Sequence, residues 1–245
     1  PCGVVHVECV GCIGVWRTVA SSRDMGVWRF GNCYLGLFCG CDVMNTSIEL
    51  QGVSKHFGRV AAVNEISLSV APGQFVGLVG HNGAGKTTTI RMLTGQLSPT
   101  AGTIQVAGVD VVADPAAAKK VLGVVPEHPA LYEYLSAREM IEFVTEVRGG
   151  GDVEWALEVA GLGKDADRLI REYSQGMRRK TALAAALVSK PPVLVLDEAL
   201  NGLDPASAER VVAVLAELRA DGATVILSTH ILDPLEKVAD RMQEE

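Results

Sequence analysis

The sequence predicts an α/β fold in which short buried strands alternate with helices, interrupted by an inserted helical subdomain. Three observations support this prediction. From about residue 48, apolar strand-like segments alternate with helical segments along the chain. Val193–Leu196 is apolar at every position, which is typical of parallel strands covered on both faces. A run of helical segments at about 128–178 contains no strand and therefore breaks the alternation.

The boundaries of the elements follow from apolar runs and from residues that end helices. Strands are predicted at Ile48–Val53, Ile66–Val70, Gln74–Val79, Ile104–Val106, Val121–Val125, Val193–Leu196 and Thr224–Leu227. Helices are predicted at Thr88–Leu93, at about Ala137–Val147 and Val153–Ala160, from about Gly176 to Val188, and at Ala206–Arg219. Three glycines at 149–151 and two prolines at 191–192 end two of these helices.

Composition indicates a globular protein that does not bind nucleic acid. The 245 residues are 48% hydrophobic and 21% charged, enough for one large domain or a domain with a small subdomain. The net charge is −7, whereas a nucleic-acid-binding surface would be basic. No uncharged apolar run approaches the roughly 18 residues of a membrane span. Action at a membrane would therefore require a partner that spans it.

Residues 1–43 differ in texture from the rest. The six cysteines all precede Met44; they are Cys2, Cys9, Cys12, Cys33, Cys39 and Cys41. Cys9 and Cys12 form the only metal-like pair, because Cys39 and Cys41 are too close for a zinc ribbon. We favour an upstream extension with no folded role, with a small metal-binding appendage and a docking segment as alternatives. The cysteine-free remainder suits a reducing cytosol.

A glycine-rich loop between a predicted strand and a predicted helix fits the phosphate-binding pattern G-x-x-x-x-G-K-[ST]. Its residues are Gly80, His81, Asn82, Gly83, Ala84, Gly85, Lys86 and Thr87, followed by Thr88. Glycines let backbone N–H groups turn toward a phosphate, and the helix N-terminus adds partial positive charge. Lys86 can reach the β- and γ-phosphates, and the Thr87 hydroxyl can bind Mg²⁺. The alternative is a glycine-rich turn that arose by chance.

An acidic pair, Asp197 and Glu198, ends the apolar strand Val193–Leu196. Such a pair lies beside the phosphate loop when both strands belong to one parallel sheet. Asp197 can hold Mg²⁺, directly or through water. Glu198 can act as general base toward the attacking water. The alternative is a solvated strand end.

Between these motifs lies a capped helix start. The segment is Tyr173, Ser174, Gln175, Gly176 and Met177, with Ser174 as N-cap. By itself this could be an ordinary cap with a basic first turn. A phosphate loop, a helical insertion, a capped helix and an acidic strand, in this order, resemble the ATP-binding cassette (ABC) ATPases from about Ile48 to the end. Ser174 and Gly176 match the family's signature loop Leu-Ser-Gly-Gly-Gln, and Gln175 and Met177 depart from it. The form Tyr-Ser-x-Gly-Met is similar to exporter cassettes for drugs, polysaccharides or antibiotics.

The resemblance implies a P-loop NTPase core with a parallel-rich sheet, an antiparallel β subdomain and the helical insert, spanning residues 44–245. It implies further site residues. The loop that crosses the dimer interface (the D-loop) would be Asn201, Gly202, Leu203 and Asp204. His230, in Ser228-Thr229-His230, would contact the γ-phosphate and help to orient Glu198 in catalysis. Phe57 would stack on adenine, with a core phenylalanine as the alternative.

Two departures from the family pattern stand out. Glu127 occupies the position where the family commonly has Gln, and we interpret it as a variant that can still meet Mg²⁺ or water. The chain stops at Glu245, where family members usually continue, which is the pattern of a fragment.

The resemblance implies an ATPase with ATP and Mg²⁺ as cofactors. Two cassettes, as a homodimer or a pair of different chains, would close head to tail on two ATP molecules. A separate membrane-spanning permease subunit would contact Glu127 and Ala130–Ser136, which would place the protein at the cytoplasmic face of the cell membrane, as part of an exporter. Two alternatives stay open: a soluble ABC ATPase acting on ribosomes or DNA, and a nucleotide-binding regulatory module without turnover.

Overall fold

The computed structural model describes residues 29–30, 33–34, 46–79, 83–229 and 241–244. The chain divides into two units, Pro1–Asp42 and Val43–Glu245. In the first unit β1 (Arg29–Phe30) pairs with β2 (Cys33–Tyr34) in antiparallel orientation. The candidate metal pair Cys9 and Cys12 lies outside the described residues.

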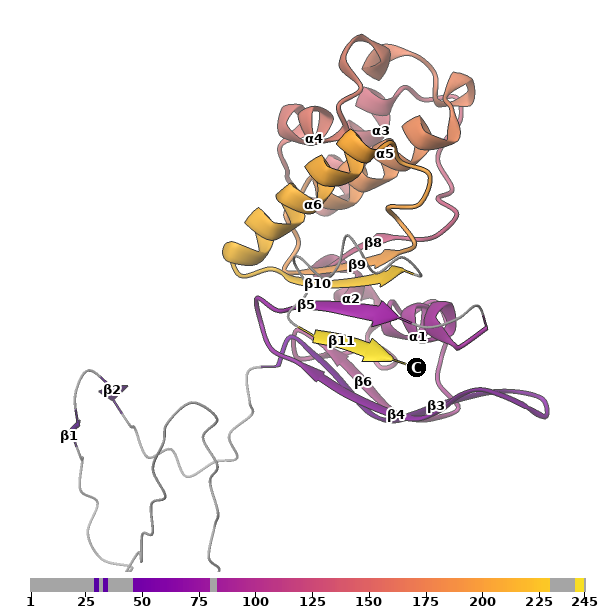
Figure 1. The fold of residues 1–245 in the computed structure, drawn as a ribbon, viewed down its shortest axis with the longest axis vertical. Helices are drawn as coiled ribbons and strands as arrows, with labels where there is room; N and C mark the ends of the chain where they lie inside the picture. Colours follow the sequence, from indigo (N-terminus) through magenta and orange to yellow (C-terminus); the bar gives the residue numbers. More distant parts are fainter. Residues whose placement is uncertain (1–28, 31–32, 35–45, 80–82, 230–240, 245) are drawn as a thin grey trace, which may run out of the picture. The chain divides into compact units, whose positions relative to one another are not determined.

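A parallel sheet forms the centre of the second unit (Figure 1). Its strands, in spatial order, are β11 (Arg241–Glu244), β5 (Phe75–Val79), β10 (Thr224–Thr229), β9 (Val193–Asp197) and β8 (Leu122–Val125). All neighbours in this sheet are parallel. In register, Thr229 lies opposite Val79, and Ser228 lies opposite Asp197. The segments that follow β5, β9 and β10 therefore start at one edge of the sheet.

A second sheet is antiparallel, with the order β4-β3-β6-β7. Its strands are β3 (Ile48–Phe57), β4 (Val60–Val70), β6 (Ala101–Val106) and β7 (Val109–Asp110). The β3–β4 hairpin is longer than the two predicted strands, because the prediction did not include its largely exposed outer half, where Val60–Val63 is a short apolar run. At Gly102, where φ is 86°, a Cβ atom would lie 2.5 Å from the Gln51 carbonyl oxygen, so only glycine lets β6 approach β3 there.

Six α-helices are described in the second unit. They are α1 (Lys86–Leu93), α2 (Pro115–Val121), α3 (Ala137–Arg148), α4 (Val153–Ala160), α5 (Gln175–Leu187) and α6 (Pro205–Ala220). Two short 3₁₀ turns, η1 (Gly163–Asp167) and η2 (Ile170–Glu172), precede α5. None of the helices in the described part of the chain combines the length and apolarity needed to cross a membrane.

Helix α2 is absent from the sequence prediction, which started a strand at Val121. In the structure Val121 ends α2, and β8 begins at Leu122. The Asp114 side chain accepts a hydrogen bond from the Ala117 N–H, and Pro115 occupies the first helical position. Both are helix-start signals, so the apolar run that follows belongs to two elements.

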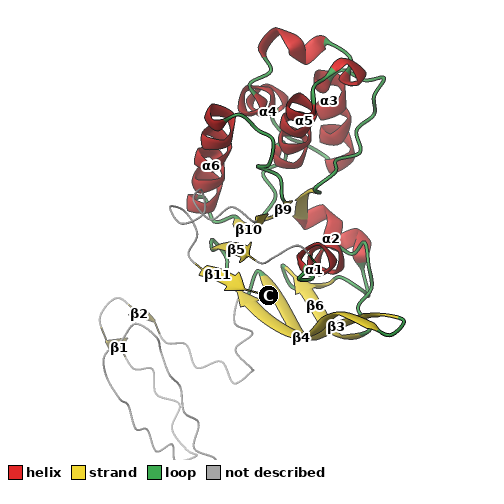
Figure 2. Cartoon of the chain, turned by 45° about the vertical axis from the view of Figure 1, so that its right-hand side comes forward, coloured by secondary structure: helices red, strands yellow, loops and turns green. Residues whose placement is uncertain are grey.

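Alternate residues of the parallel strands face two hydrophobic cores. Val193, Val195 and Ile226 pack with α1, α2 and the antiparallel sheet. Leu194 and Leu196 pack on the opposite face, with α5 and α6. Figure 2 shows the helices α3–α6 on one side of the sheet, and α1, α2 and the antiparallel strands on the other. This period of two explains the all-apolar strand Val193–Leu196.

A third core holds the helical subdomain together. It consists of residues from α3, α4, the two 3₁₀ turns and α5, including Ile141, Ala156 and Ile170. Helix α5 also contributes Leu183 and Leu187 to the core under the sheet. Since α5 belongs to both cores, it joins the helical subdomain to the sheet.

Candidate functional site

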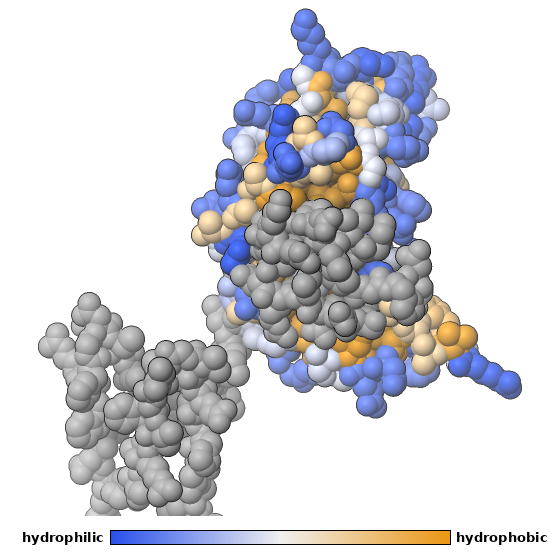
Figure 3. Space-filling model, viewed as in Figure 1, coloured by the Kyte–Doolittle hydropathy of each residue, from blue (hydrophilic) through white to orange (hydrophobic). Residues whose placement is uncertain are grey.

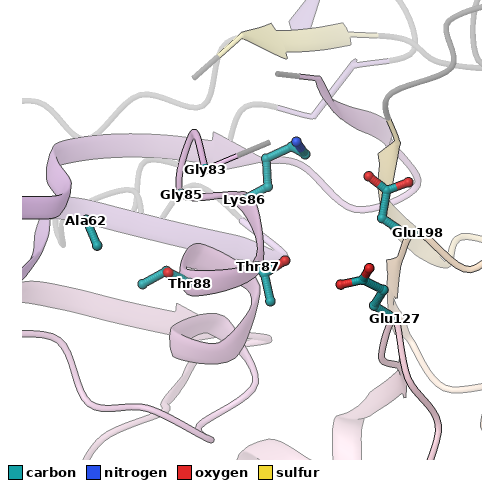
Figure 4. A pocket seen from close by; sticks show the side chains of 8 residues that line it. All are labelled: Ala62, Gly83, Gly85, Lys86, Thr87, Thr88, Glu127 and Glu198. Atoms are coloured by element: carbon teal, nitrogen blue, oxygen red, sulfur yellow. The ribbon is translucent and has the colours of Figure 1, made fainter. Parts of the chain in front are cut away.

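A pocket of about 340 Å³ lies at the carboxyl edge of the parallel sheet. Its lining consists of Ala62, Gly83, Gly85, Lys86, Thr87, Thr88, Glu127 and Glu198. In Figure 4 the loop and the first turn of α1 form one wall, and the carboxylates of Glu127 and Glu198 point toward them from the other. The structure therefore brings together the described residues of the phosphate loop and two of the predicted carboxylates.

The N-terminus of α1 differs from those of the other described helices. Side chains of Asp114, Ser136, Asp152, Ser174 and Asp204 each accept a backbone N–H in the first turn of their own helix. No side chain caps α1, which begins after Gly85 with φ at 102° and carries no acidic residue in its first turn. The uncapped helix start faces the pocket, so its N–H groups and positive dipole end can receive an anion.

Asp197 and Ser228 lie side by side at the ends of β9 and β10. Both are buried, and the Ser228 hydroxyl donates a hydrogen bond of 2.6 Å to Asp197 Oδ1. The parallel register places the two residues opposite each other, so their side chains share one face of the sheet.

Glu198 is held in an unusual backbone conformation. Its φ is 49°, in the left-handed region that costs a non-glycine residue roughly 1–3 kcal/mol. Its N–H donates to the Ser228 carbonyl at 3.2 Å and to the Ser228 hydroxyl at 3.0 Å. Its Oε2 accepts a hydrogen bond of 2.7 Å from the Asn201 side-chain amide. Glu198 is only 9% exposed, so the alternative of a solvated strand end is wrong.

The predicted signature loop forms the start of α5. Ser174 accepts a hydrogen bond of 3.3 Å from the Met177 N–H, which confirms its prediction as N-cap. Tyr173 is buried in the core of the helical subdomain, while Ser174 and Gln175 are exposed. A Cβ atom on Gly176 would lie 3.4 Å from the Gly202 carbonyl oxygen, so this helix start lies against the predicted D-loop. None of the five signature residues lines the pocket of its own chain.

Three consecutive basic residues in the first turns of α5 contact three different segments. Arg178 pairs with Glu133 at 2.8 Å, and Lys180 pairs with Asp204 at 3.1 Å. Arg179 donates a hydrogen bond of 3.1 Å to the carbonyl oxygen of Glu127. Sequence reasoning treated these cations only as a basic first turn. The run of three basic residues that begins four positions after the N-cap was the available signal.

Ser228 is another residue that sequence reasoning missed as part of the site. A serine directly after the apolar run Val225–Leu227 was the available signal, because a buried hydroxyl needs a polar partner.

Phe57 lies at the end of β3, in the hairpin whose Ala62 lines the pocket. It is 52% exposed, so the alternative of a core phenylalanine is wrong. The Lys55 ammonium lies 5.3 Å from the ring centroid, a cation–π distance. Figure 3 shows apolar surface at the tip of this hairpin, where Phe57 and Val60 are exposed. Of the other predicted site residues, Gly80, His81, Asn82 and His230 lie outside the described residues.

Comparison with known proteins identifies the family. The model of the ABC transporter family matches residues 63–201, which include the acidic strand and every residue that lines the pocket except Ala62. The chain belongs to the ABC transporter family. The predicted resemblance and fold class are thereby confirmed. The match ends at Asn201, the first residue of the predicted D-loop.

This ABC cassette is similar to several ATP-binding proteins of transport systems. It is 36% identical over 202 residues to the bacitracin transport ATP-binding protein BcrA of Enterococcus faecalis, a match that covers 81% of this chain and 66% of the relative. It is 37% identical to the daunorubicin resistance ATP-binding protein DrrA3 of Streptomyces coeruleorubidus, covering 81% of this chain and 65% of the relative. It is 38% identical to the Nod factor export ATP-binding protein I of Mesorhizobium japonicum, covering 80% of this chain and 59% of the relative. The chain thus spans less than two thirds of the length of these curated relatives.

Solved structures show the same fold. An ATP-binding subunit of an ABC transporter superposes with a TM-score of 0.77 at 29% identity, over 81% of this chain and 85% of that chain. A dimeric ATP-binding cassette in a post-hydrolysis state, bound to ADP and phosphate, superposes with a TM-score of 0.74 at 23% identity, over 80% of this chain and 93% of that chain.

Proposed function

We propose that this cassette binds and hydrolyses ATP and powers a membrane exporter. One observation supports the proposal most directly: a single pocket sets the uncapped start of α1, with Lys86 and Thr87, against the carboxylates of Glu127 and Glu198. A binding surface for phosphate facing a proton acceptor suits the attack of water on the phosphoanhydride bond of the terminal phosphate of ATP.

ATP binding would use the loop and the β3–β4 hairpin together. Backbone N–H groups at the start of α1 would hold the phosphates, and Lys86 would neutralise part of their charge. Phe57 would cover the adenine, because an exposed ring at the end of β3 offers a face for stacking. Gly83 and Gly85 both have positive φ, which favours a loop that wraps around a phosphate.

The side chains around the pocket also fit Mg²⁺, which prefers oxygen ligands and usually keeps several waters. The candidate ligands are Thr87 and Glu127, which line the pocket from opposite walls, and the Asp197 carboxylate, which is buried next to Glu198. Among the described residues, no three His, Cys, Asp or Glu side chains form a metal cluster, so phosphate oxygens would complete the shell. Bound Mg²⁺ would neutralise charge on the phosphates.

Glu198 is the proposed general base in hydrolysis. Its carboxylate points into the pocket, and its backbone and side chain are both held by neighbours. A positioned base contributes typically about 10²–10⁴-fold to a hydrolysis rate. His230, which lies outside the described residues, would assist from the segment after β10.

We propose that two cassettes close head to tail on ATP, with the signature loop of each completing the other's site. Because Ser174 and Gln175 are exposed and do not line the pocket of their own chain, they remain available to a second copy. The Ser174 hydroxyl accepts from the Met177 N–H and keeps its proton for a phosphate oxygen. The positive end of α5 would add to this contact.

The helical subdomain carries the proposed contact with a separate membrane-spanning permease. Tyr132, Tyr134 and Phe143 are exposed, with Tyr134 at 80%, and the rings of Tyr132 and Phe143 meet edge to face. Exposed aromatic residues that cluster in this way are typical of protein interfaces. Arg178 pairs with Glu133, within this segment, and Arg179 binds the main chain of Glu127. A permease at Glu127 and Ala130–Ser136 would hold the cassette at the cytoplasmic face of the membrane.

A steady-state assay of phosphate release tests the proposal with the full chain, Mg²⁺ and ATP. We expect turnover by the unaltered protein, and near-complete loss in Glu198→Gln with ATP binding retained. Binding without turnover in the unaltered protein would favour the regulatory module. Failure to bind ATP at all would contradict both the proposed ATPase and the regulatory module.

A further inference from the structure

Ser228 occupies a position from which one hydroxyl group contacts two of the site's three acidic residues, Asp197 and Glu198. It is 0% exposed and lies at the end of β10, directly opposite Asp197 in the parallel register. The residues that line the pocket include neither Ser228 nor Asp197, and both lie buried beside Glu198, which does line it.

The hydrogen bonds of this hydroxyl are directional. A serine hydroxyl has one proton to donate and lone pairs to accept. The proton is donated to Asp197 Oδ1 at 2.6 Å, and a lone pair accepts the Glu198 N–H at 3.0 Å. The first bond fixes the orientation of the Asp197 carboxylate and leaves Oδ2 for a cation. The second helps to fix the left-handed backbone of Glu198, where φ is 49°.

We propose that Ser228 is a positioning residue for the hydrolysis reaction. Its hydroxyl sets Asp197 for Mg²⁺ and Glu198 for the attacking water at the same time. The inference rests on the proposed function, since it assigns Ser228 a part in the same reaction.

The chain offers a matched control for this arrangement. Ser54, in β3 of the antiparallel sheet, is also buried, and its hydroxyl accepts the N–H of Glu65 at 2.9 Å. Glu65 also has a φ of 49°. Ser54→Ala therefore removes the same kind of bond to the same kind of backbone, but outside the pocket lining.

The experiment compares Ser228→Ala, Ser228→Thr and Ser54→Ala in the full chain. Calorimetry measures ATP affinity at saturating Mg²⁺ and in EDTA, and steady-state assays give kcat and KM. In Ser228→Ala we expect the Mg²⁺-dependent gain in ATP affinity and kcat each to fall about 10- to 100-fold, the usual effect of removing a partner of a metal ligand. Affinity in EDTA stays within about twofold. Ser228→Thr, which keeps the hydroxyl, restores both quantities, and Ser54→Ala changes neither.

Melting temperatures show whether each variant is folded. If threonine does not fit the buried site, Ser228→Ala alone still tests whether Ser228 is a positioning residue. A folded Ser228→Ala protein with an unchanged kcat and an unchanged Mg²⁺-dependent gain in ATP affinity would overturn this inference but not the proposed function. An equal loss of affinity in EDTA and in Mg²⁺ would also overturn it, because that pattern indicates a purely structural role. Failure of the unaltered chain to bind ATP would instead overturn the proposed function.

Discussion

The side-chain amide of Asn201 donates a hydrogen bond of 2.7 Å to Oε2 of Glu198, and its N–H donates to the Glu198 carbonyl at 3.1 Å. The first residue of the predicted D-loop is thus bonded to the proposed general base through both its side chain and its main chain. A partner cassette that displaced this loop would also displace the carboxylate.

Glu198→Gln should trap an ATP-dependent dimer. The glutamine oxygen can still accept the hydrogen bond from Asn201, so the loop is expected to keep its conformation, while the amide cannot take a proton from water. Turnover should fall about 10²–10⁴-fold. Unhydrolysed ATP should then hold two chains together, as measured by size-exclusion chromatography with light scattering.

Ser174→Arg in the Glu198→Gln background is the control for this dimer. The bulky side chain should abolish the dimer without changing ATP binding to the chain's own pocket. A Glu198→Gln protein that stays monomeric at saturating ATP would count against the head-to-tail arrangement.

Lys86→Ala should weaken ATP binding about 10- to 100-fold, because charge-assisted hydrogen bonds are typically worth roughly 1.5–3 kcal/mol. Calorimetry with ATP measures the loss. Lys119→Ala, which removes an exposed lysine from α2, is the matched control and should bind ATP normally. Equal affinities for the two variants would contradict the assignment of the phosphate loop.

Glu127→Gln should tighten ATP binding and change turnover only modestly. Removing one negative charge near the phosphates relieves a repulsion of about 1 kcal/mol at 4 Å in water, roughly fivefold in affinity. Arg179 binds the main-chain oxygen of residue 127, so this contact survives the substitution. Glu142→Gln, on the exposed face of α3, is the control. A fall in turnover by orders of magnitude would instead make Glu127 a catalytic carboxylate.

Asp204→Asn should reduce stability in a pH-dependent way. The hydroxyl and N–H of Ser207, together with Lys180, lower the pKa of the Asp204 carboxyl below its usual range. A lowered folded-state pKa means that the ionised group stabilises the fold above about pH 4 and that this contribution is lost as the pH falls further. The melting temperature of the variant should lie below that of the unaltered chain at pH 7, and the gap should narrow below about pH 4.

The effect of Asp204→Asn should be small, because the pair with Lys180 is at the surface and asparagine also caps helices. Lys180→Met combined with Asp204→Asn should add little to either single change. If the difference in melting temperature between Asp204→Asn and the unaltered chain stays constant with pH, the ionised Asp204 carboxylate does not stabilise the fold as proposed.

A chain that begins at Met44 should fold and bind ATP like the full chain. The hydrophobic clusters described in the structure consist of residues from Ile48 onward. Thermal unfolding and calorimetry compare the two chains. A large drop in melting temperature would show that residues 1–43 pack on the core.

Sequence patterns predicted the parts of the fold that have strong periodicity. The all-apolar strand at Val193 and the N-cap at Ser174 are confirmed, because burial on both faces and first-turn N–H groups leave clear local signals. The outer half of the β3–β4 hairpin was missed: most of its residues are exposed, and the short apolar run Val60–Val63 was not predicted as a strand. Helix α2 was missed because its apolar end merges with β8.

Contacts between distant segments could not be read from local pattern. The bond from Ser228 to Asp197 joins residues 31 positions apart, and the bond from Arg179 to Glu127 joins residues 52 positions apart. Both depend on which strands become neighbours in the sheet, a property of the whole topology. The motifs themselves were found because the residues of each are consecutive.

Helix α5 limits how the helical subdomain could be exchanged between related cassettes. Leu183 and Leu187 of α5 pack under the sheet, while Ala184, Ala185 and Val188 pack against α3 and α4. A chimera that imported only the region before residue 173 would therefore pack α3 and α4 of one cassette against α5 of another. When the crossover falls after Val188, one donor supplies α3, α4 and α5 together. Recombination between relatives should therefore succeed more often with a crossover there than with one before Ser174.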